Sequence, residues 1–258
     1  MKTSSPNILR NITKSFVGVI FILLSNPTFS QKKIINTSQQ WIQSYNEAKL
    51  TCRWTIMLDG GIRWKEGFSQ KTSFIVRGGI GYLISPKVMV AAGFAHVGIY
   101  SEELVILQEF RPYQEISYKT NLGKVGLSQR FRLEEQFFKD KSNLSLFSDL
   151  GFNYRFRYSV MLGIPLFGLS SKNHDRKLIL NVGDEIFLKA GKQISSRVFD
   201  KNRFIISPTV QWNKELSFAF TYNLQFTTSI IPEEFVLSQV AWLQVKYSLD
   251  FTSSKAKH

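Results

Sequence analysis

Apolar and polar residues alternate one by one along several long segments of the chain. The clearest segment is 216–226, where every even-numbered residue is large and apolar and every odd-numbered residue is small or polar. Segments 125–133 and 150–164 repeat this pattern, and their polar positions include pairs of arginines. Because successive side chains of a strand point to opposite faces, each segment predicts a β-strand with one apolar and one polar face.

Less regular alternation brings the number of predicted strands to ten. The additional strands are expected at 51–64, 72–84, 87–100, 109–120, 178–189, 203–212 and 234–251. Residues 41–48 show a weaker pattern, and they are either an added strand with an unrecognised partner or a lead-in to the first strand. Many of these segments exceed ten residues, which is long for a soluble sheet and suits strands that cross a bilayer at a tilt.

The predicted connections alternate in length over much of the chain. Tight-turn signals occur at Ser85-Pro86, Asn121 to Gly123 and Asn213-Lys214. Longer polar links are predicted at 65–71, 101–108, 139–149 and 190–202, and the link at 165–177 is longer than the alternation predicts. This organisation is typical of a closed, antiparallel, up-and-down transmembrane β-barrel of about ten strands, within a range of ten to twelve. It predicts an even number of strands, with both ends of the barrel domain on the periplasmic side.

The N-terminal segment 1–31 has the layout of a secretory signal peptide. A basic start without acidic residues is followed by an apolar run from Phe16 to Leu24 and a break at Pro27. The run is shorter than the roughly 20 residues of a spanning helix, although an N-terminal anchor helix is the alternative. No transmembrane helix is expected after signal removal. We therefore predict a signal peptide at 1–31, an outer-membrane barrel domain at 32–251 and a basic tail at 252–258.

The polar face of the predicted strands carries arginine mixed with acidic residues. A narrow lumen favours arginine, because its planar fork pairs with carboxylates through two parallel hydrogen bonds. Buried charges must be paired, and these strands supply both signs. We predict a charged network in the lumen that is also a candidate binding site, formed by Arg53, Asp59, Arg63, Arg77, Glu109, Arg111, Glu115, Arg130, Arg132, Glu134, Arg155, Arg157, Glu185 and Arg203.

The apolar face carries aromatic residues at both ends of several strands, such as Trp54 and Trp64. Such pairs are typical of the aromatic girdles of membrane barrels. The alternative is a soluble, lipocalin-like barrel with an apolar interior. At the end of the last strand, Tyr247, Leu249 and Phe251 resemble the C-terminal assembly signal of bacterial outer-membrane barrels, except that seven residues follow Phe251.

Composition and charge narrow the expected partners. The chain has 33 Lys plus Arg against 19 Asp plus Glu, and loss of the signal peptide leaves a formal charge of +11. Such a charge suits nucleic acid, anionic lipid or acidic ligands, but scattered basic residues on strands and export argue against nucleic acid. The expected partners are outer-membrane lipid, the barrel-assembly machinery and small anionic solutes. With Cys52 as its one cysteine, the chain lacks a disulfide framework, and we expect no metal and no cofactor.

Several strings of residues resemble the bacterial outer-membrane barrels grouped as domain of unknown function 2490. They are Leu50 to Asp59 with Arg63-Trp64, Ala92 to Phe94, Glu109 to Gln114, Gln129 to Glu134, Arg155 to Tyr158, Asp184-Glu185 and Phe199 to Arg203. The family usually shows Trp-Gln where this chain has Tyr113-Gln114, and Gln-Asn-Arg where it has Lys201 to Arg203. The resemblance implies a barrel of unknown function and supplies no catalytic residues.

Three roles remain open from the sequence. The barrel is a narrow or occluded structure filled by Arg–Glu pairs, a pore or binding barrel that favours anions, or an outer-membrane lipid-modifying enzyme of the acyl hydrolase type. An acyl hydrolase needs a serine and a histidine close together. His96, the one histidine on a predicted strand, shares a face with Phe94 and Tyr100, and its surroundings do not match the Ser-Asn-Gly context of outer-membrane phospholipase A. Asp59 and Glu185 could act as acid and base, although pairing with arginine is commoner. No catalytic residue is therefore assigned.

Overall fold

The structure is a computed structural model that describes residues 33–140, 151–191, 198–229, 231 and 233–252. The predicted signal peptide and all of the basic tail except Thr252 lie outside these residues. No helix in this part of the chain is long and apolar enough to cross a membrane.

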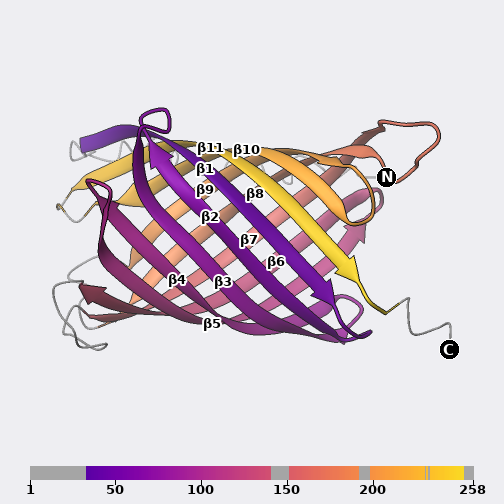
Figure 1. Ribbon diagram of the computed structural model, residues 1–258, viewed down its shortest axis with the longest axis horizontal. Coiled ribbons are helices and arrows are strands. Elements are labelled where there is room, and N and C mark those ends of the chain that lie inside the picture. Colours follow the sequence, from indigo (N-terminus) through magenta and orange to yellow (C-terminus); the bar gives the residue numbers. More distant parts are fainter. Residues whose placement is uncertain (1–32, 141–150, 192–197, 230, 232, 253–258) are drawn as a thin grey trace, which may run out of the picture. The chain divides into compact units, whose positions relative to one another are not determined.

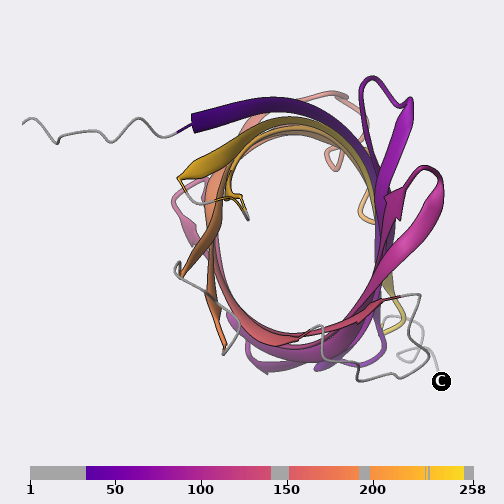
Figure 2. The ribbon, with the colours of Figure 1, turned by 90° about the vertical axis from the view of Figure 1, so that its left-hand side faces the viewer.

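Eleven strands form one closed barrel (Figures 1 and 2). They are β1 (Lys33–Lys49), β2 (Trp54–Lys65), β3 (Gln70–Ser85), β4 (Val88–Ser101), β5 (Leu104–Leu122), β6 (Val125–Asp140), β7 (Phe152–Gly168), β8 (Lys177–Ala190), β9 (Phe199–Gln211), β10 (Leu216–Thr228) and β11 (Glu234–Asp250). Strands that follow one another in sequence pair antiparallel, and β1 and β11 close the ring. The predicted all-β, closed, up-and-down barrel is confirmed.

The barrel closes through two strands that run in the same direction. Eleven alternating strands give β1 and β11 the same orientation, as their arrows in Figure 1 show. Thr37 lies 2.8 Å from Ser238 between the two side-chain oxygens, and the amide of Phe251 donates to the carbonyl of Lys49 at 3.0 Å. The start of β1 and the end of β11 therefore lie at opposite ends of the barrel. The prediction of an even strand number with both ends on one side is wrong.

The extra strand is β1, which contains the weak segment 41–48. It pairs with β2 from Gln39 opposite Lys65 to Lys49 opposite Thr55. The pattern there was weak because the inward positions of β1 mix aromatic and polar side chains, including the buried Trp41. The partner of β1 is therefore the first predicted strand, 51–64, and the interpretation of 41–48 as a lead-in to that strand is wrong.

Four links between strands are shorter than the sequence suggested, and the links predicted at 165–177 and 190–202 are reduced to 169–176 and 191–198. β4 and β5 are joined by Glu102 and Glu103 alone, with φ angles of 49° and 66°. Both residues adopt the left-handed conformation that suits a two-residue hairpin, and neither is a glycine that would have marked the turn. The link between β2 and β3 is likewise confined to 66–69, whereas the tight turns predicted at Ser85-Pro86, Asn121 to Gly123 and Asn213-Lys214 are confirmed. Most of the link predicted at 139–149 lies outside the described residues.

The two faces of the barrel have opposite chemistry. In β10, Ala219, Thr221 and their odd-numbered neighbours are buried inside, whereas Phe218 and Phe220 are 43% and 54% exposed on the outside. The same division holds around the ring, with buried arginines and carboxylates inside and exposed large apolar residues outside. A lipocalin-like barrel with an apolar interior is therefore excluded.

Glycines make room for one large inward side chain. A methyl group on Gly93 of β4 would lie 2.6 Å from Cζ of Tyr113, and one on Gly79 of β3 would lie 3.2 Å from the same atom. Tyr113 is 3% exposed, and the guanidinium carbon of Arg132 lies 4.5 Å from its ring centroid. The glycines therefore let an aromatic ring lie flat on the barrel wall beneath an arginine of the network.

Gly93→Ala is expected to destabilise the barrel by about 1–3 kcal/mol, because a well-packed site accepts extra atoms only by displacing its neighbours. The matched control is Gly126→Ala on β6, where the nearest atoms to the new methyl lie 3.7 Å away. Urea unfolding midpoints of the two variants in the same detergent measure the difference. Equal midpoints would show that the packing of the Tyr113 ring against β4 does not require a glycine at position 93.

Candidate functional site: a cationic cavity in the barrel

A cavity of about 560 Å³ lies inside the barrel and is lined by the inward positions of its strands. Its walls carry only two carboxylates, Glu47 and Glu185. The cationic side chains on the same walls are Arg63, Arg77, Arg111, Lys119, Arg130, Arg155, Arg157, Lys201, Arg203 and Lys246. Among the described lining residues, cations therefore outnumber carboxylates by ten to two, and part of this charge is balanced by carboxylates behind the lining, such as Asp59, Glu109 and Glu134.

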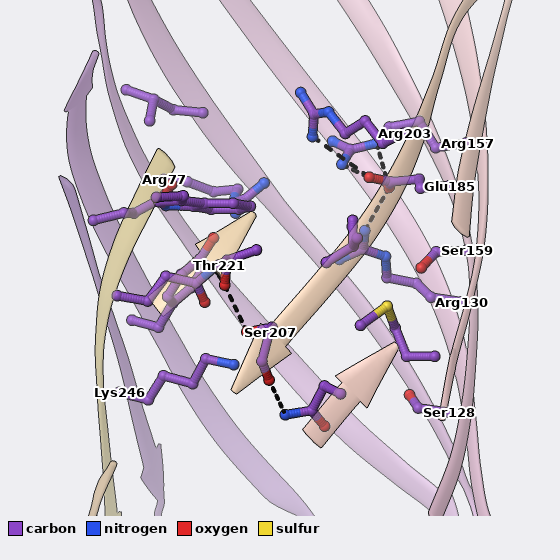
Figure 3. A pocket seen from close by; sticks show the side chains of 18 of the residues that line it. Arg77, Ser128, Arg130, Arg157, Ser159, Glu185, Arg203, Ser207, Thr221 and Lys246 are labelled. Atoms are coloured by element: carbon purple, nitrogen blue, oxygen red, sulfur yellow. Dashed lines mark hydrogen bonds and ion pairs between the residues drawn. The ribbon is translucent and has the colours of Figure 1, made fainter. Parts of the chain in front are cut away.

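Glu185 of β8 is the centre of one part of the charged network (Figure 3). Its carboxylate accepts hydrogen bonds from Nη2 of Arg130 at 2.6 Å and from Nη2 of Arg157 at 2.7 Å. Nη1 of Arg203 lies 3.5 Å from its second oxygen. Glu185 is 3% exposed, so a single buried negative charge is shared by three guanidinium groups from β6, β7 and β9.

Glu134 of β6 is a second centre, and Arg157 joins it to Glu185. Glu134 accepts hydrogen bonds from Nη1 of Arg157 at 2.5 Å and from Arg155, whose Nε lies at 2.9 Å. Arg155 also lies 3.8 Å from Asp200, which pairs with Lys189 at 2.9 Å. This continuous network crosses four strands, and such pairing compensates for the desolvation of its charges.

Other pairs extend the network around the wall. Glu115 pairs with Arg132 at 2.6 Å, and Glu109 pairs with Arg111 and accepts a hydrogen bond from Gln136. On the opposite side, Nε of Arg77 donates to Asp59 at 2.7 Å, and Gln43 donates to the same carboxylate at 2.8 Å. All of the predicted network residues except one therefore face the interior.

Arg53 is the exception, and its placement in the lumen was wrong. It precedes β2, which begins at Trp54, and its side chain is exposed. Its Nη1 donates to the hydroxyl of Tyr82 at 2.9 Å. Alternation predicts a side only within a strand, and the chain bends at 51–53 just before β2 starts.

Two aromatic residues that the sequence did not predict to be inside lie in the cationic interior. Trp41 and Phe187 are 2% and 1% exposed. The guanidinium carbon of Arg63 lies 4.1 Å from the Trp41 centroid, and that of Arg157 lies 4.6 Å from the Phe187 centroid. Aromatic residues were assigned to the outer face alone, although cation–π contact with arginine is a stable way to bury a ring among charges.

Asp200 and Lys201 were missed for a different reason. The predicted strand began at 203, whereas β9 begins at Phe199. The pairing of β8 with β9 shifts register between Phe187 and Leu188, opposite the start of β9. This irregularity brings Asp200 into contact with Lys189 and Arg155, while Lys201 lines the cavity. Simple alternation would not place two adjacent residues on the same side.

His96, His174 and Cys52 do not line the cavity. The His96 ring stacks on Phe110 with centroids 4.9 Å apart and an interplanar angle of 6°. His174 is exposed in the link before β8, and Cys52 is exposed near β2. Within the described ranges, no group of three or more His, Cys, Asp or Glu residues could hold a metal ion.

The residues of the predicted assembly signal lie at the end of β11. Tyr247 and Phe251 are 38% and 47% exposed, and Leu249 shares their alternating register. Leu216 of β10 pairs with Tyr247, so the last aromatic residues lie where β11 leaves the barrel.

Taken with the fold, these features define a class of protein: a closed β-barrel with an apolar exterior and a cationic, arginine-rich lumen. The chain belongs to the protein family of unknown function DUF2490, whose family model matches residues 38–235. The resemblance found from the sequence is thereby confirmed. No curated protein and no solved structure matches the chain.

Proposed function

We propose that the protein is a bacterial outer-membrane barrel whose narrow lumen takes in small anions. The observation that carries this proposal is the reversed polarity of the barrel: arginines and carboxylates lie inside while large apolar residues lie outside. Soluble proteins rarely expose extended apolar surfaces, and an outward apolar band with a polar interior is the arrangement of membrane barrels.

The outer face supports contact with lipid. Leu58, Ile80 and Phe220 lie well inside their strands and are 54%, 53% and 54% exposed. Polar pairs interrupt this face: Asn202 donates to Asp184 at 2.6 Å, Tyr158 donates to Gln129 at 2.8 Å, and Asn46 donates to Ser44 at 3.1 Å. Each pair is hydrogen-bonded within itself, which reduces the cost of polar groups in an apolar environment.

The lumen supports a preference for anions. Rings of cationic side chains raise the local concentration of anions and oppose the entry of cations. The Glu134 and Glu185 networks hold several arginines rigidly against the wall, so the passage is narrow and its charge is fixed in position.

Export and assembly complete the proposal. Residues 1–31 would act as a signal peptide that directs the chain out of the cytoplasm. The barrel-assembly machinery would recognise the alternating Tyr247, Leu249 and Phe251 at the end of β11. Neither step involves nucleic acid, and we propose none as a partner.

The alternative of a lipid-modifying acyl hydrolase lacks a supporting arrangement. A nucleophile of that type needs a histidine within hydrogen-bond reach. The cavity lining contains serines but no histidine, and His96 packs between aromatic residues, with Phe74 and Phe110 at centroid distances of 5.4 and 4.9 Å.

Conductance across planar bilayers tests the proposal. The purified protein is expected to give small, stable currents whose reversal potential in a KCl gradient indicates preference for chloride. Changing Lys119 and Lys246 together to glutamate should lower the anion-to-cation permeability ratio by about threefold or more, because it reverses two charges of the lining.

Arg176→Gln is the control for that double variant. The guanidinium carbon of Arg176 lies 4.0 Å from the Trp212 centroid in a link between strands, and Arg176 does not line the cavity. Its permeability ratio should equal that of the unmodified protein. No current at any voltage, or a preference for cations, would overturn the proposal.

A further inference from the structure

A second, more specific feature lies within the cavity, where cations gather on two buried rings. We call Trp41, Phe187, Arg63, Lys201 and Arg203 the Trp41–Phe187 cluster. The guanidinium carbons of Arg63 and Arg203 lie 4.1 and 5.2 Å from the Trp41 centroid. They come from β2 and β9, so the closed barrel brings them together across its interior.

Phe187 links the same arginine to a lysine. The guanidinium carbon of Arg203 lies 4.8 Å from the Phe187 centroid, and Nζ of Lys201 lies 5.7 Å from it. Arg203 thus contacts both rings, and it shares Trp41 with Arg63 and Phe187 with Lys201. All three cations line the cavity, and Figure 3 shows Arg203 on the wall beside Arg157 and Glu185.

The carboxylates nearby balance these three cations only in part, because Asp200 attracts the adjacent Lys201 but also pairs with Lys189 and Arg155. Within the described part of the chain, neither Arg63 nor Lys201 lies within ion-pair distance of a carboxylate. Arg203 lies 3.5 Å from Glu185, but that carboxylate is held more closely by Arg130 and Arg157. Like charges repel strongly where water is partly excluded, so the cluster favours a bound anion.

The chemistry of the cluster selects the type of anion. A guanidinium that rests on an aromatic ring has a fixed orientation, and its N–H groups can donate hydrogen bonds to an oxyanion. Nε of Arg203 already donates to Gln225 at 2.9 Å, so Arg203 can offer its Nη groups to the anion. Lysine adds a point charge to such a site. Two guanidinium groups and one ammonium match a tetrahedral phosphate group, which offers several acceptor oxygens and close to two negative charges at neutral pH.

We propose that the Trp41–Phe187 cluster binds the phosphate group of a small solute. The proposal rests on the proposed function, because the solute must enter the lumen. The cavity of about 560 Å³ lies in the range of small-molecule sites, so it has room for a small phosphate ester as well as for inorganic phosphate.

Calorimetric titration of the full barrel in detergent, at constant ionic strength, tests the proposal. Inorganic phosphate is expected to bind at least about 10-fold more tightly than chloride, and glycerol phosphate serves as the ester probe. Tighter binding of glycerol phosphate would identify an ester as the ligand, and equal binding would identify the phosphate group alone. Phosphate binding no stronger than that of chloride would overturn the proposal.

Variants separate the cluster from the general charge of the lumen. Arg63→Gln should weaken phosphate binding by about 10-fold or more, and Arg63→Lys should recover part of it, since lysine keeps the charge but loses the fork. Lys119→Gln removes one charge elsewhere in the cavity and should weaken binding by less than about threefold. Arg176→Gln, also an arginine on a tryptophan, should leave binding unchanged. Equal losses in Arg63→Gln and Lys119→Gln would refute a specific site.

Failure of this inference can be told apart from failure of the proposed function. An unmodified barrel that conducts chloride but does not prefer phosphate disproves only the phosphate site. A barrel that neither conducts nor binds anions disproves both. Heat-modified gel mobility of each variant confirms that the barrel is folded before any titration.

Discussion

Replacement of Glu185 by glutamine is expected to lower the free energy of unfolding by about 3 kcal/mol or more. The change keeps the size of the side chain but removes the one negative charge that Arg130, Arg157 and Arg203 share. Removal of one partner from a buried ion pair is costly because the remaining charges are left uncompensated. Urea unfolding of the refolded protein measures this effect through the midpoint and slope of the transition.

Two further variants show whether the loss comes from the network. Asp184→Asn alters the adjacent carboxylate, which is exposed on the outer face of β8, and should change stability by less than about 1 kcal/mol. Adding Arg157→Gln to Glu185→Gln should recover part of the loss, because it removes a cation that keeps only Glu134 as its carboxylate partner after the first change, and residues of one network couple by about 0.5–3 kcal/mol. Strictly additive losses would show that Arg157 and Glu185 act independently.

Substitution of an outward-facing residue in the middle of a strand by arginine is expected to have the second large effect on stability. Val76 lies near the centre of β3 and is 52% exposed. If this face meets lipid, Val76→Arg should destabilise the barrel in a bilayer by about 2–4 kcal/mol. In a water-exposed barrel the same change would be nearly neutral, so unfolding from lipid vesicles tests the proposed membrane location directly.

The control for this prediction is the same substitution at the end of a strand, away from the middle of the barrel wall. Leu122 is the last residue of β5 and is 60% exposed. An arginine there can extend into the interfacial region, so Leu122→Arg should cost no more than about 1 kcal/mol. Equal effects of Val76→Arg and Leu122→Arg would contradict a lipid-facing band across the middle of the strands.

Alternation of side chains was enough to predict most of the barrel. In 216–226 and 125–133 the large apolar residues are flanked by small or polar residues, so the strand and both faces follow from the two-residue period. The inward placement of Arg130, Arg132, Arg155 and Arg157 follows from the same rule, and the structure bears it out. Arg53 was misplaced because it lies in a turn, where the period does not apply.

The sequence predicted a closed barrel, but it did not predict the odd number of strands or the pairing of β1 with β11. The mixture of aromatic and polar residues in 33–48 made the alternation of β1 weak. The inward face of β1 contacts cations through Trp41 and Tyr45, and the strand therefore lacks a clear apolar side. That strand made the count odd and gave the barrel its parallel pairing between β1 and β11. Such pairing depends on which strands meet around the ring, and no local pattern specifies it.

The sequence by itself determined that the chain forms long amphipathic strands with charges on one face, since that depends on the alternation of neighbouring side chains. Only the tertiary structure decided which charges meet. Glu185 gathers arginines from three strands, and Trp41 gathers Arg63 and Arg203 from β2 and β9, which are far apart in sequence. These contacts arise because a closed barrel directs its inward side chains into one narrow interior. Arginine side chains, aromatic rings and carboxylates from different strands are therefore brought into contact there.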